Sequence, residues 1–202
     1  MLRLPFLAAA LGALAIAAAS PLLAAPADPA VARIETLDRA LIDTLKQGPS
    51  LGPKGRYRKL EPVIDAAFDL PQMTRIAVGP AWNTMSAADQ EALVKAFTRL
   101  TVASYAHNFD KFGGETFTVD PAAQTRGTDK VVKSVLTPGS GAPVNLTYRM
   151  RLSGGTWKII DVYYGAISQL TTRRADFAGP LASGGAKGLV AHLDGLSDKL
   201  LG

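Results

Sequence analysis

The apolar residues of this chain change their spacing at Gly113-Gly114, and that change limits the folds open to the chain. Before this point, apolar residues recur every three or four positions, which is the period of an amphipathic helix. After it they alternate with polar residues, most clearly between 144 and 152, as in a half-buried strand. The glycine pair 154–155 then predicts a hairpin turn, and residues 156–164 the returning strand.

Residues that begin and end helices divide the rest of the chain. Asp28-Pro29 predicts a helix start, Gly48-Pro49 predicts its end, and the residues from Ser86 to Asp89 have the form of a capping box. Residues 49–56 are expected to form a loop. The expected helical segments are 29–47, a broken region over 57–78, 86–112, 166–177 and 185–201, and the expected strands are 116–119, 131–136, 144–153 and 156–164. Helices followed by an antiparallel meander and further helices predict the α+β class.

The first 27 residues have the composition of a targeting segment. Arg3 precedes an apolar stretch rich in Leu and Ala, and small residues follow as they do at a signal-peptidase site. We expect a cleaved signal peptide over 1–27, with cleavage after Ala27 or alternatively after Ala19, and a single domain over 28–202. The sequence contains no cysteine, so an exported domain of this size has no disulfides and depends on its hydrophobic core.

Few residues in the sequence have the spacing of a catalytic or metal site. His107 and His192 lack zinc-ligand spacing, no Gly-x-Ser-x-Gly occurs, and the glycine-rich segments lack the phosphate-loop pattern. We therefore expect no metal and no cofactor. The net charge of +5 is too diffuse to predict nucleic-acid binding. Arg173-Arg174 either meets an anionic headgroup or a partner, or belongs to a solvated face.

Asp161 is a carboxylate inside the apolar run 157–164 and has two possible roles. A two-residue turn at 154–155 pairs Tyr148 with Asp161 and Leu146 with Tyr163, all on one face of the sheet. Asp161 is then either an acid or base of an active site, with Tyr148 beside it, or a structural group that is hydrogen-bonded at the corner between strand and helix. The apolar face of the sheet on which Asp161 would lie either closes into a core or stays open as a pocket. The spacing of apolar residues is the same in both cases and does not distinguish them.

Two long segments resemble a known family of exported lipid carriers. The segment 157–196 (WKIIDVYYGAISQLTTRRADFAGPLASGGAKGLVAHLDGL) is similar to the C-terminal signature of the toluene-tolerance, or maintenance-of-lipid-asymmetry, family. The segment 77–119 (AVGPAWNTMSAADQEALVKAFTRLTVASYAHNFDKFGGETFTV) is similar to the central part of that family. The resemblance covers about residues 33–201. Within it, the segment LTTRRADF (170–177) resembles the corresponding segment of the branch associated with hopanoid biosynthesis.

The resemblance implies a monomeric periplasmic carrier that moves phospholipid or a hopanoid-type lipid between the inner and outer membranes without covalent chemistry. It implies two protein partners, an inner-membrane ABC transporter complex and an outer-membrane lipoprotein and porin complex. It also implies a curved antiparallel sheet packed with helices around an apolar cavity. The residues that match the pocket-forming segments are Val63, Phe68, Met73, Ile76, Trp82, Phe97, Leu100, Leu146, Tyr148, Met150, Ile159, Tyr163 and Ile167.

Two other classes of function stay open at this point. The first is an enzyme on a cone-shaped α+β scaffold, in which Asp161 and Tyr148 act on a lipid or a small apolar substrate. The second is an adaptor that binds protein partners through its basic helices and carries no ligand. Lipid that co-purifies with the protein separates the carrier from both.

Overall fold

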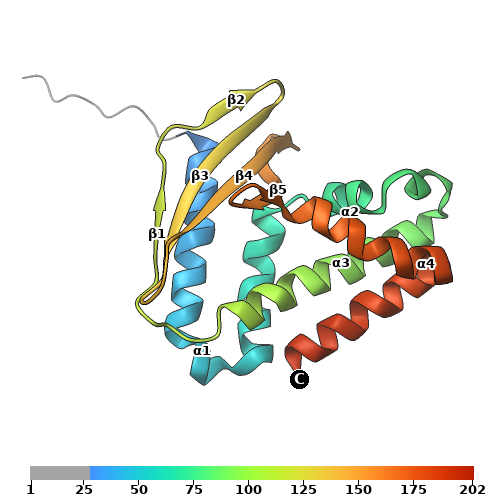
Figure 1. Ribbon diagram of the computed structural model, residues 1–202, viewed down its shortest axis with the longest axis horizontal. Coiled ribbons are helices and arrows are strands. Elements are labelled where there is room, and N and C mark those ends of the chain that lie inside the picture. The colour runs from blue at the N-terminus through green and yellow to red at the C-terminus, as the bar shows by residue number, and fades with distance from the viewer. Residues whose placement is uncertain (1–27) are drawn as a thin grey trace, which may run out of the picture.

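The computed structural model describes residues 28–202, so the expected signal peptide lies outside the described residues. Within residues 28–202 the chain forms four α-helices, one 3-10 helix and six strands (Figure 1). They are α1 (Pro29–Ala67), α2 (Leu70–Val78), η1 (Gly79–Thr84), α3 (Ala87–Asn108), β1 (Thr116–Val119), β2 (Gln124–Arg126), β3 (Asp129–Thr137), β4 (Val144–Ser153), β5 (Thr156–Tyr164), β6 (Ile167–Ser168) and α4 (Gln169–Leu201). The predicted α+β class is confirmed.

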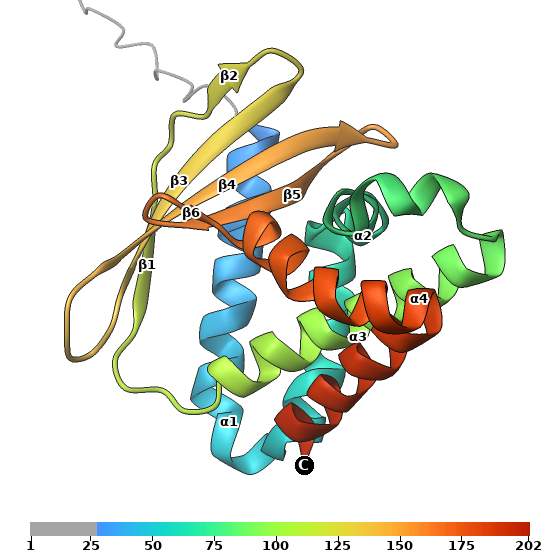
Figure 2. The same cartoon turned by 45° about the vertical axis from the view of Figure 1, so that its right-hand side comes forward.

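The strands form one antiparallel sheet in the order β1-β3-β4-β5-β6, with β2 paired to β3. Figure 2 shows the sheet curving over one arm of α1, with α2, α3 and α4 gathered beyond it. Helix α1 contacts β1, β3 and β5 as well as α3, so it joins the sheet to the other helices. The expected curved meander packed with helices is therefore the observed architecture.

The main core lies between the sheet and the helices. Alternate residues of the strands face it and are buried, because the pleat sends successive side chains to opposite faces. The buried sheet residues of this core are Val132, Leu146, Tyr148, Met150, Ile159 and Val162. Helices α1 and α3 cover them with Ile34, Leu37, Leu41, Leu60, Ile64, Leu93, Phe97 and Leu100. The capping residues predicted at Asp28 and Ser86 are confirmed as the N-caps of α1 and α3.

The prediction of a loop over 49–56 is wrong, because this segment is helical and α1 consists of two arms joined by a kink. Gly52 has φ 61°, a conformation that glycine adopts without the Cβ clash that other residues meet there. Pro53 follows directly and begins the second arm, where its missing N–H costs little. The glycine and proline residues of this segment therefore turn the helix rather than open a loop.

A buried arginine ties the kink to the end of α3. The Arg56 guanidinium donates from Nε to the carbonyl oxygen of Ala106 at 2.6 Å and from Nη1 to that of Gly48 at 3.0 Å. Gly48 lies so close to the segment after α3 that a Cβ on it would be 1.9 Å from the carbonyl oxygen of Asp110. The glycine allows α1 to approach this segment, and the arginine satisfies carbonyl groups on α1 and α3.

The expected register of the 154–155 hairpin holds for only half of its length. Leu152 pairs with Trp157 and Met150 with Ile159, as predicted. A β-bulge then places one extra residue in β5, so that Arg149 rather than Tyr148 lies opposite Asp161. The predicted pairs of Tyr148 with Asp161 and of Leu146 with Tyr163 are wrong for this reason. Their actual partners are Val162 and Tyr164.

The C-terminal helical region also differs from the expected boundaries. Residues 167–168 form the short strand β6, which pairs with β5, and α4 begins only at Gln169. The two helices expected over 166–177 and 185–201 are arms of α4, which is kinked at Gly185 with φ 60°. Strand β2 was not expected. Among the described residues, no helix combines the length and the apolar character needed to cross a membrane.

Candidate functional site

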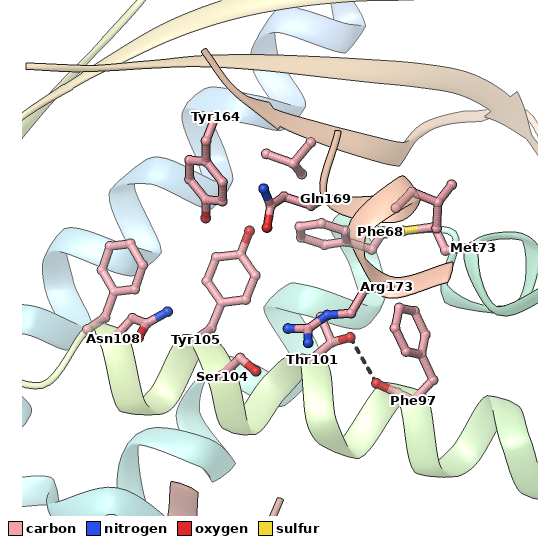
Figure 3. Close-up of a pocket in the computed structure, with 13 residues that line it drawn as sticks. Phe68, Met73, Phe97, Thr101, Ser104, Tyr105, Asn108, Tyr164, Gln169 and Arg173 are labelled. Atoms are coloured by element: carbon pink, nitrogen blue, oxygen red, sulfur yellow. Dashed lines mark hydrogen bonds between the residues drawn. The ribbon is translucent and has the colours of Figure 1, made fainter. Parts of the chain in front are cut away.

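A partly open cavity of about 160 Å³, here called the inner cavity, lies where α2, α3 and α4 meet the end of β5 (Figure 3). Its walls come from segments far apart in the sequence. The residues that line it are Phe68, Met73, Phe97, Thr101, Ser104, Tyr105, Asn108, Phe109, Val162, Tyr164, Gln169, Leu170 and Arg173. Most of the exposed area of its walls is apolar.

Helix α3 supplies one side of the inner cavity, because its lining residues follow the helical period from Phe97 to Asn108. Two of them carry hydroxyl groups that are already used. Thr101 donates to the carbonyl oxygen of Phe97 at 2.8 Å, and Ser104 donates to that of Leu100 at 2.8 Å. Neither hydroxyl proton is available to a ligand, so both residues act mainly as small, weakly polar wall groups.

Aromatic rings form the deep wall. Phe68 meets Tyr105 edge to face with ring centroids 5.7 Å apart, and Tyr105 stacks on Phe109 at 5.9 Å. Phe97 in turn meets Phe177 edge to face at 5.8 Å. Burial raises the pKa of the Tyr105 phenol well above 10, so its hydroxyl stays neutral at ordinary pH. A wall of neutral rings suits an apolar ligand.

Polar groups gather on one side of the inner cavity. Figure 3 shows the hydroxyl groups of Tyr105 and Tyr164 and the amide of Gln169 turned toward one another, while Arg173 reaches from α4 toward α3. Tyr164 is 44% exposed, which marks this side as the mouth. The Arg173 guanidinium lies 3.6 Å from the carboxylate of Asp176 and is partly open to solvent. A cation at the mouth of an apolar cavity is placed to meet an anionic group.

Asp161 lies outside the inner cavity and fixes the strand-to-helix corner. Its Oδ1 accepts from the buried amide of Leu170 at 3.0 Å, and its Oδ2 accepts from the Ser168 hydroxyl at 2.7 Å. The Ser168 oxygen in turn accepts from the amide of Thr171 at 3.0 Å, which caps α4. Asp161 is 5% exposed and has these partners at the first turn of α4, so its role in the structure is that of an anchor.

The enzyme hypothesis paired Asp161 with Tyr148, and the structure does not bring them together. The bulge leaves Asp161 on the sheet face of Arg149, opposite to the face on which Tyr148 enters the core. Burial raises the pKa of the Tyr148 phenol well above 10, which makes it a poor acid and a poor base. Within residues 28–202, no group of three or more His, Cys, Asp or Glu side chains is placed to hold a metal ion.

The structure brings three of the predicted lipid-contacting residues, Phe68, Met73 and Phe97, to the wall of the inner cavity. A second group is fully buried in the core beside it, namely Leu100, Leu146, Tyr148, Met150 and Ile159. The remaining predicted residues lie apart from the inner cavity. Val63 lines a groove between the arms of α1, Ile76 and Trp82 pack at the edge of the core, Tyr163 lies on the other sheet face, and Ile167 is 64% exposed.

The sequence reasoning missed several residues of the inner cavity. Tyr105 lies eight residues after Phe97, on the apolar side of α3, so helical spacing was a usable signal for it. Val162 and Tyr164 carried no such signal, because only the bulge turns them to the core face in place of Asp161 and Tyr163. Leu170 and Arg173 reach the cavity because Asp161 holds the start of α4 there.

Comparison with known proteins gives two findings. The family model described as "MlaC protein" matches residues 35–195. Among solved structures, the chain is similar to a phospholipid-binding protein from Ralstonia solanacearum that was determined in complex with a phospholipid. The two are 27% identical, the match covers 86% of this chain and 99% of the other, and the TM-score is 0.73.

Proposed function

The chain belongs to the MlaC protein family, and from this premise we propose that it is a periplasmic carrier that binds phospholipid by its acyl chains in the inner cavity. The observation that carries the proposal is the apolar, aromatic-walled cavity of this chain. It lies in a fold similar to that of a protein whose structure was determined in complex with a phospholipid. Phe68, Met73 and Phe97 are proposed to contact the acyl chains directly. The buried residues behind them, such as Tyr148 and Ile159, give that wall its shape.

Burial of acyl chains supplies the binding energy without polar contacts. Each methylene group that leaves water contributes about 0.8 kcal/mol, so a pair of tails binds strongly to any apolar cavity that accommodates it. The same energy opposes spontaneous release into water. We therefore propose that release requires a protein partner that opens the cavity, as in exchange with an inner-membrane ABC transporter complex and an outer-membrane lipoprotein and porin complex.

The mouth is proposed to hold the headgroup. Arg173 is the cation among the residues lining the inner cavity, and a phosphate group accepts charge-assisted hydrogen bonds from a guanidinium. Tyr164 and Gln169 add neutral donors beside it. Polar groups at the mouth and rings inside match the two ends of a phospholipid. This arrangement requires no covalent chemistry and no cofactor, so we propose that the protein is not an enzyme.

Finer assignments rest on the sequence. We propose that residues 1–27 are a cleaved signal peptide and that residues 28–202 are one lipid-binding domain that acts as a monomer. The segment LTTRRADF over 170–177 supports the proposal that this protein belongs to the branch associated with hopanoid biosynthesis. A hopanoid-type lipid is therefore the second cargo to be tested beside phospholipid.

The test is native mass spectrometry of the exported protein after gentle purification, followed by lipid extraction. The expected result is a protein that carries phospholipid or hopanoid-type lipid at close to one molecule per chain. Delipidated protein should take lipid up again from vesicles that contain phosphatidylethanolamine and phosphatidylglycerol. Protein that is empty in every preparation, and that takes up no lipid from vesicles, would exclude the carrier function.

A further inference from the structure

The inner cavity is small for a phospholipid. An engineered protein cavity of about 150 Å³ is filled by a single benzene molecule, and the inner cavity measures about 160 Å³. Each acyl chain of a membrane lipid spans half of a hydrocarbon layer about 30 Å thick, so it is much longer than a benzene ring. Two such chains need more apolar space than the inner cavity offers.

A second hollow of about 510 Å³ shares one wall residue with the inner cavity. It is bounded by the end of α1, by α2, by α3 and by β5, and Phe68 lines both spaces. Beside Phe68, its walls include Asp65, Leu70, Pro71, Val94, Arg99 and Lys158. Phe68 is the residue common to the walls of both spaces, so its side chain is the natural candidate for a partition between them.

The main chain of Phe68 is held in place by its contacts with β5. Phe68 ends α1 in an extended conformation and forms a parallel bridge with Ile159 of β5, and the next amide, that of Asp69, donates to the Ile159 carbonyl oxygen at 2.9 Å. The ring is 2% exposed and contacts Tyr105 edge to face. A rotation of this ring would change the separation of the two spaces and leave these main-chain contacts intact.

The second hollow is mainly apolar although charged residues surround it. Leu70, Pro71 and Val94 supply apolar walls, and the long cationic side chains add their methylene stems. The charged ends of two of them are already paired, one with carboxylates of α4 and the other with a main-chain carbonyl group at the wall of the hollow. Arg99 bonds Asp194 at 3.2 Å and Asp198 at 2.6 Å, and the ammonium group of Lys158 donates to the Asp65 carbonyl oxygen at 3.1 Å.

We propose, on the basis of the proposed function, that acyl chains pass Phe68 from the inner cavity into the second hollow, which accommodates their distal ends. The partition then determines how long a chain the protein accepts. In the absence of lipid the Phe68 ring closes the passage and covers Tyr105. When lipid enters, the ring turns aside and packs against the chain.

The test fills the second hollow from the side away from the inner cavity. Val94→Trp places a large side chain in the second hollow, since Val94 lines it and is not a wall of the inner cavity. Ala92→Trp is the matched control, on the same helix, exposed and outside both spaces. The probes are dioctanoyl and dioleoyl phosphatidylethanolamine, added to delipidated protein and measured by native mass spectrometry and fluorescence titration.

The expected result is a loss of about tenfold or more in affinity for the dioleoyl lipid in Val94→Trp, with binding of the dioctanoyl lipid unchanged. Ala92→Trp should bind both lipids as the wild type does. Phe68→Leu, which keeps an apolar side chain but shortens the partition, should take up the dioleoyl lipid faster than the wild type does.

Each other outcome decides against the proposal. If Val94→Trp binds both lipids like the wild type, or loses both equally while thermal melting shows it folded, the chains do not enter the second hollow. The carrier function then stands without this inference. If wild-type protein binds neither lipid, the proposed function itself fails.

Discussion

The carboxylate of Asp161 in β5 accepts a hydrogen bond from the buried main-chain amide of Leu170 in α4, at 3.0 Å. This contact decides where α4 begins, and Leu170 and Arg173 reach the inner cavity from that first turn. A carboxylate that resembles a catalytic group in the sequence thus shapes a cavity that it does not line.

Removal of this anchor should destabilise the protein and deplete its lipid. Asp161→Ala leaves the Leu170 amide and the Ser168 hydroxyl without their acceptor, which is expected to cost about 3 kcal/mol of unfolding free energy. Asp161→Asn retains one acceptor oxygen and should cost about 1 kcal/mol. Urea denaturation measures both, and lipid content is read by mass spectrometry.

Asp120→Ala is the control for this pair, because its carboxylate also accepts a main-chain hydrogen bond, from Ala122, but in an exposed loop. It should cost less than about 1 kcal/mol. Equal costs for Asp161→Ala and Asp120→Ala would contradict the anchoring role.

Asp38 should make stability depend on pH. Burial beneath the sheet raises the pKa of Asp38 from 3.8 to about 7, against the opposing effects of the Ser134 hydrogen bond and of Arg39, while Glu35 adds to the rise. Its Oδ1 has no hydrogen-bond partner among the described residues. Between pH 3.8 and about 7, the folded state therefore keeps a proton on Asp38 that the unfolded chain has released. The unfolding free energy consequently falls as the pH rises through this range.

The expected loss is up to about 4 kcal/mol across this pH range. Asp38→Asn imitates the protonated carboxyl group. Its unfolding free energy should match that of the wild type near pH 3.8 and exceed it above neutral pH. Chemical denaturation at a series of pH values measures the difference, with the exposed Asp43→Asn as control. A constant difference between Asp38→Asn and wild type at every pH would refute the prediction.

Arg173 should contribute to headgroup binding rather than to tail binding. Arg173→Gln is expected to weaken the uptake of phosphatidylglycerol by about tenfold at low salt, because a partly exposed charge-assisted hydrogen bond contributes about that much. Lys187→Gln makes the same charge change on α4 outside the inner cavity and should have little effect. Vesicle-transfer assays at two salt concentrations measure both. Equal effects of the two substitutions would indicate only a general charge effect.

Narrowing the inner cavity should reduce lipid content more than stability. Ser104→Phe adds a ring where the serine lines the cavity, and the lost hydroxyl served only the carbonyl of its own helix. Co-purified lipid should fall at least severalfold while the melting temperature changes by only a few degrees. His107→Phe, on the same helix and exposed, is the control. Full lipid content in Ser104→Phe would show that lipid lies elsewhere.

The kink of α1 should depend on Arg56. Arg56→Met retains much of the apolar stem but leaves the carbonyl oxygens of Gly48 and Ala106 without their buried donor, at an expected cost of about 3 kcal/mol. Arg58→Met, two residues along the same helix, is the control. Urea denaturation compares them, and a cost for Arg56→Met no larger than that for Arg58→Met would contradict the role of the kink contact.

Local pattern was enough to predict most of the elements. The alternation from Val144 to Leu152, the capping residues Asp28 and Ser86, and the turn at 154–155 each depend on neighbours a few positions away, so the sequence carries them directly. The same locality explains the errors. Gly52 takes a positive φ that turns a helix, and only the contact between α1 and α3 makes a kink there better than a loop.

By itself, the sequence determined the α+β order of helices and strands, the apolar face of the sheet and the small number of residues with the spacing of a catalytic site. The tertiary structure decided which side chains form the inner cavity. One extra residue in β5 exchanges the faces of Asp161, Val162, Tyr163 and Tyr164, because strand side chains alternate with a period of two. The tertiary structure also decided the size of the inner cavity and the position of Phe68 at the walls of both the inner cavity and the second hollow. Both depend on how distant segments pack and not on any local pattern.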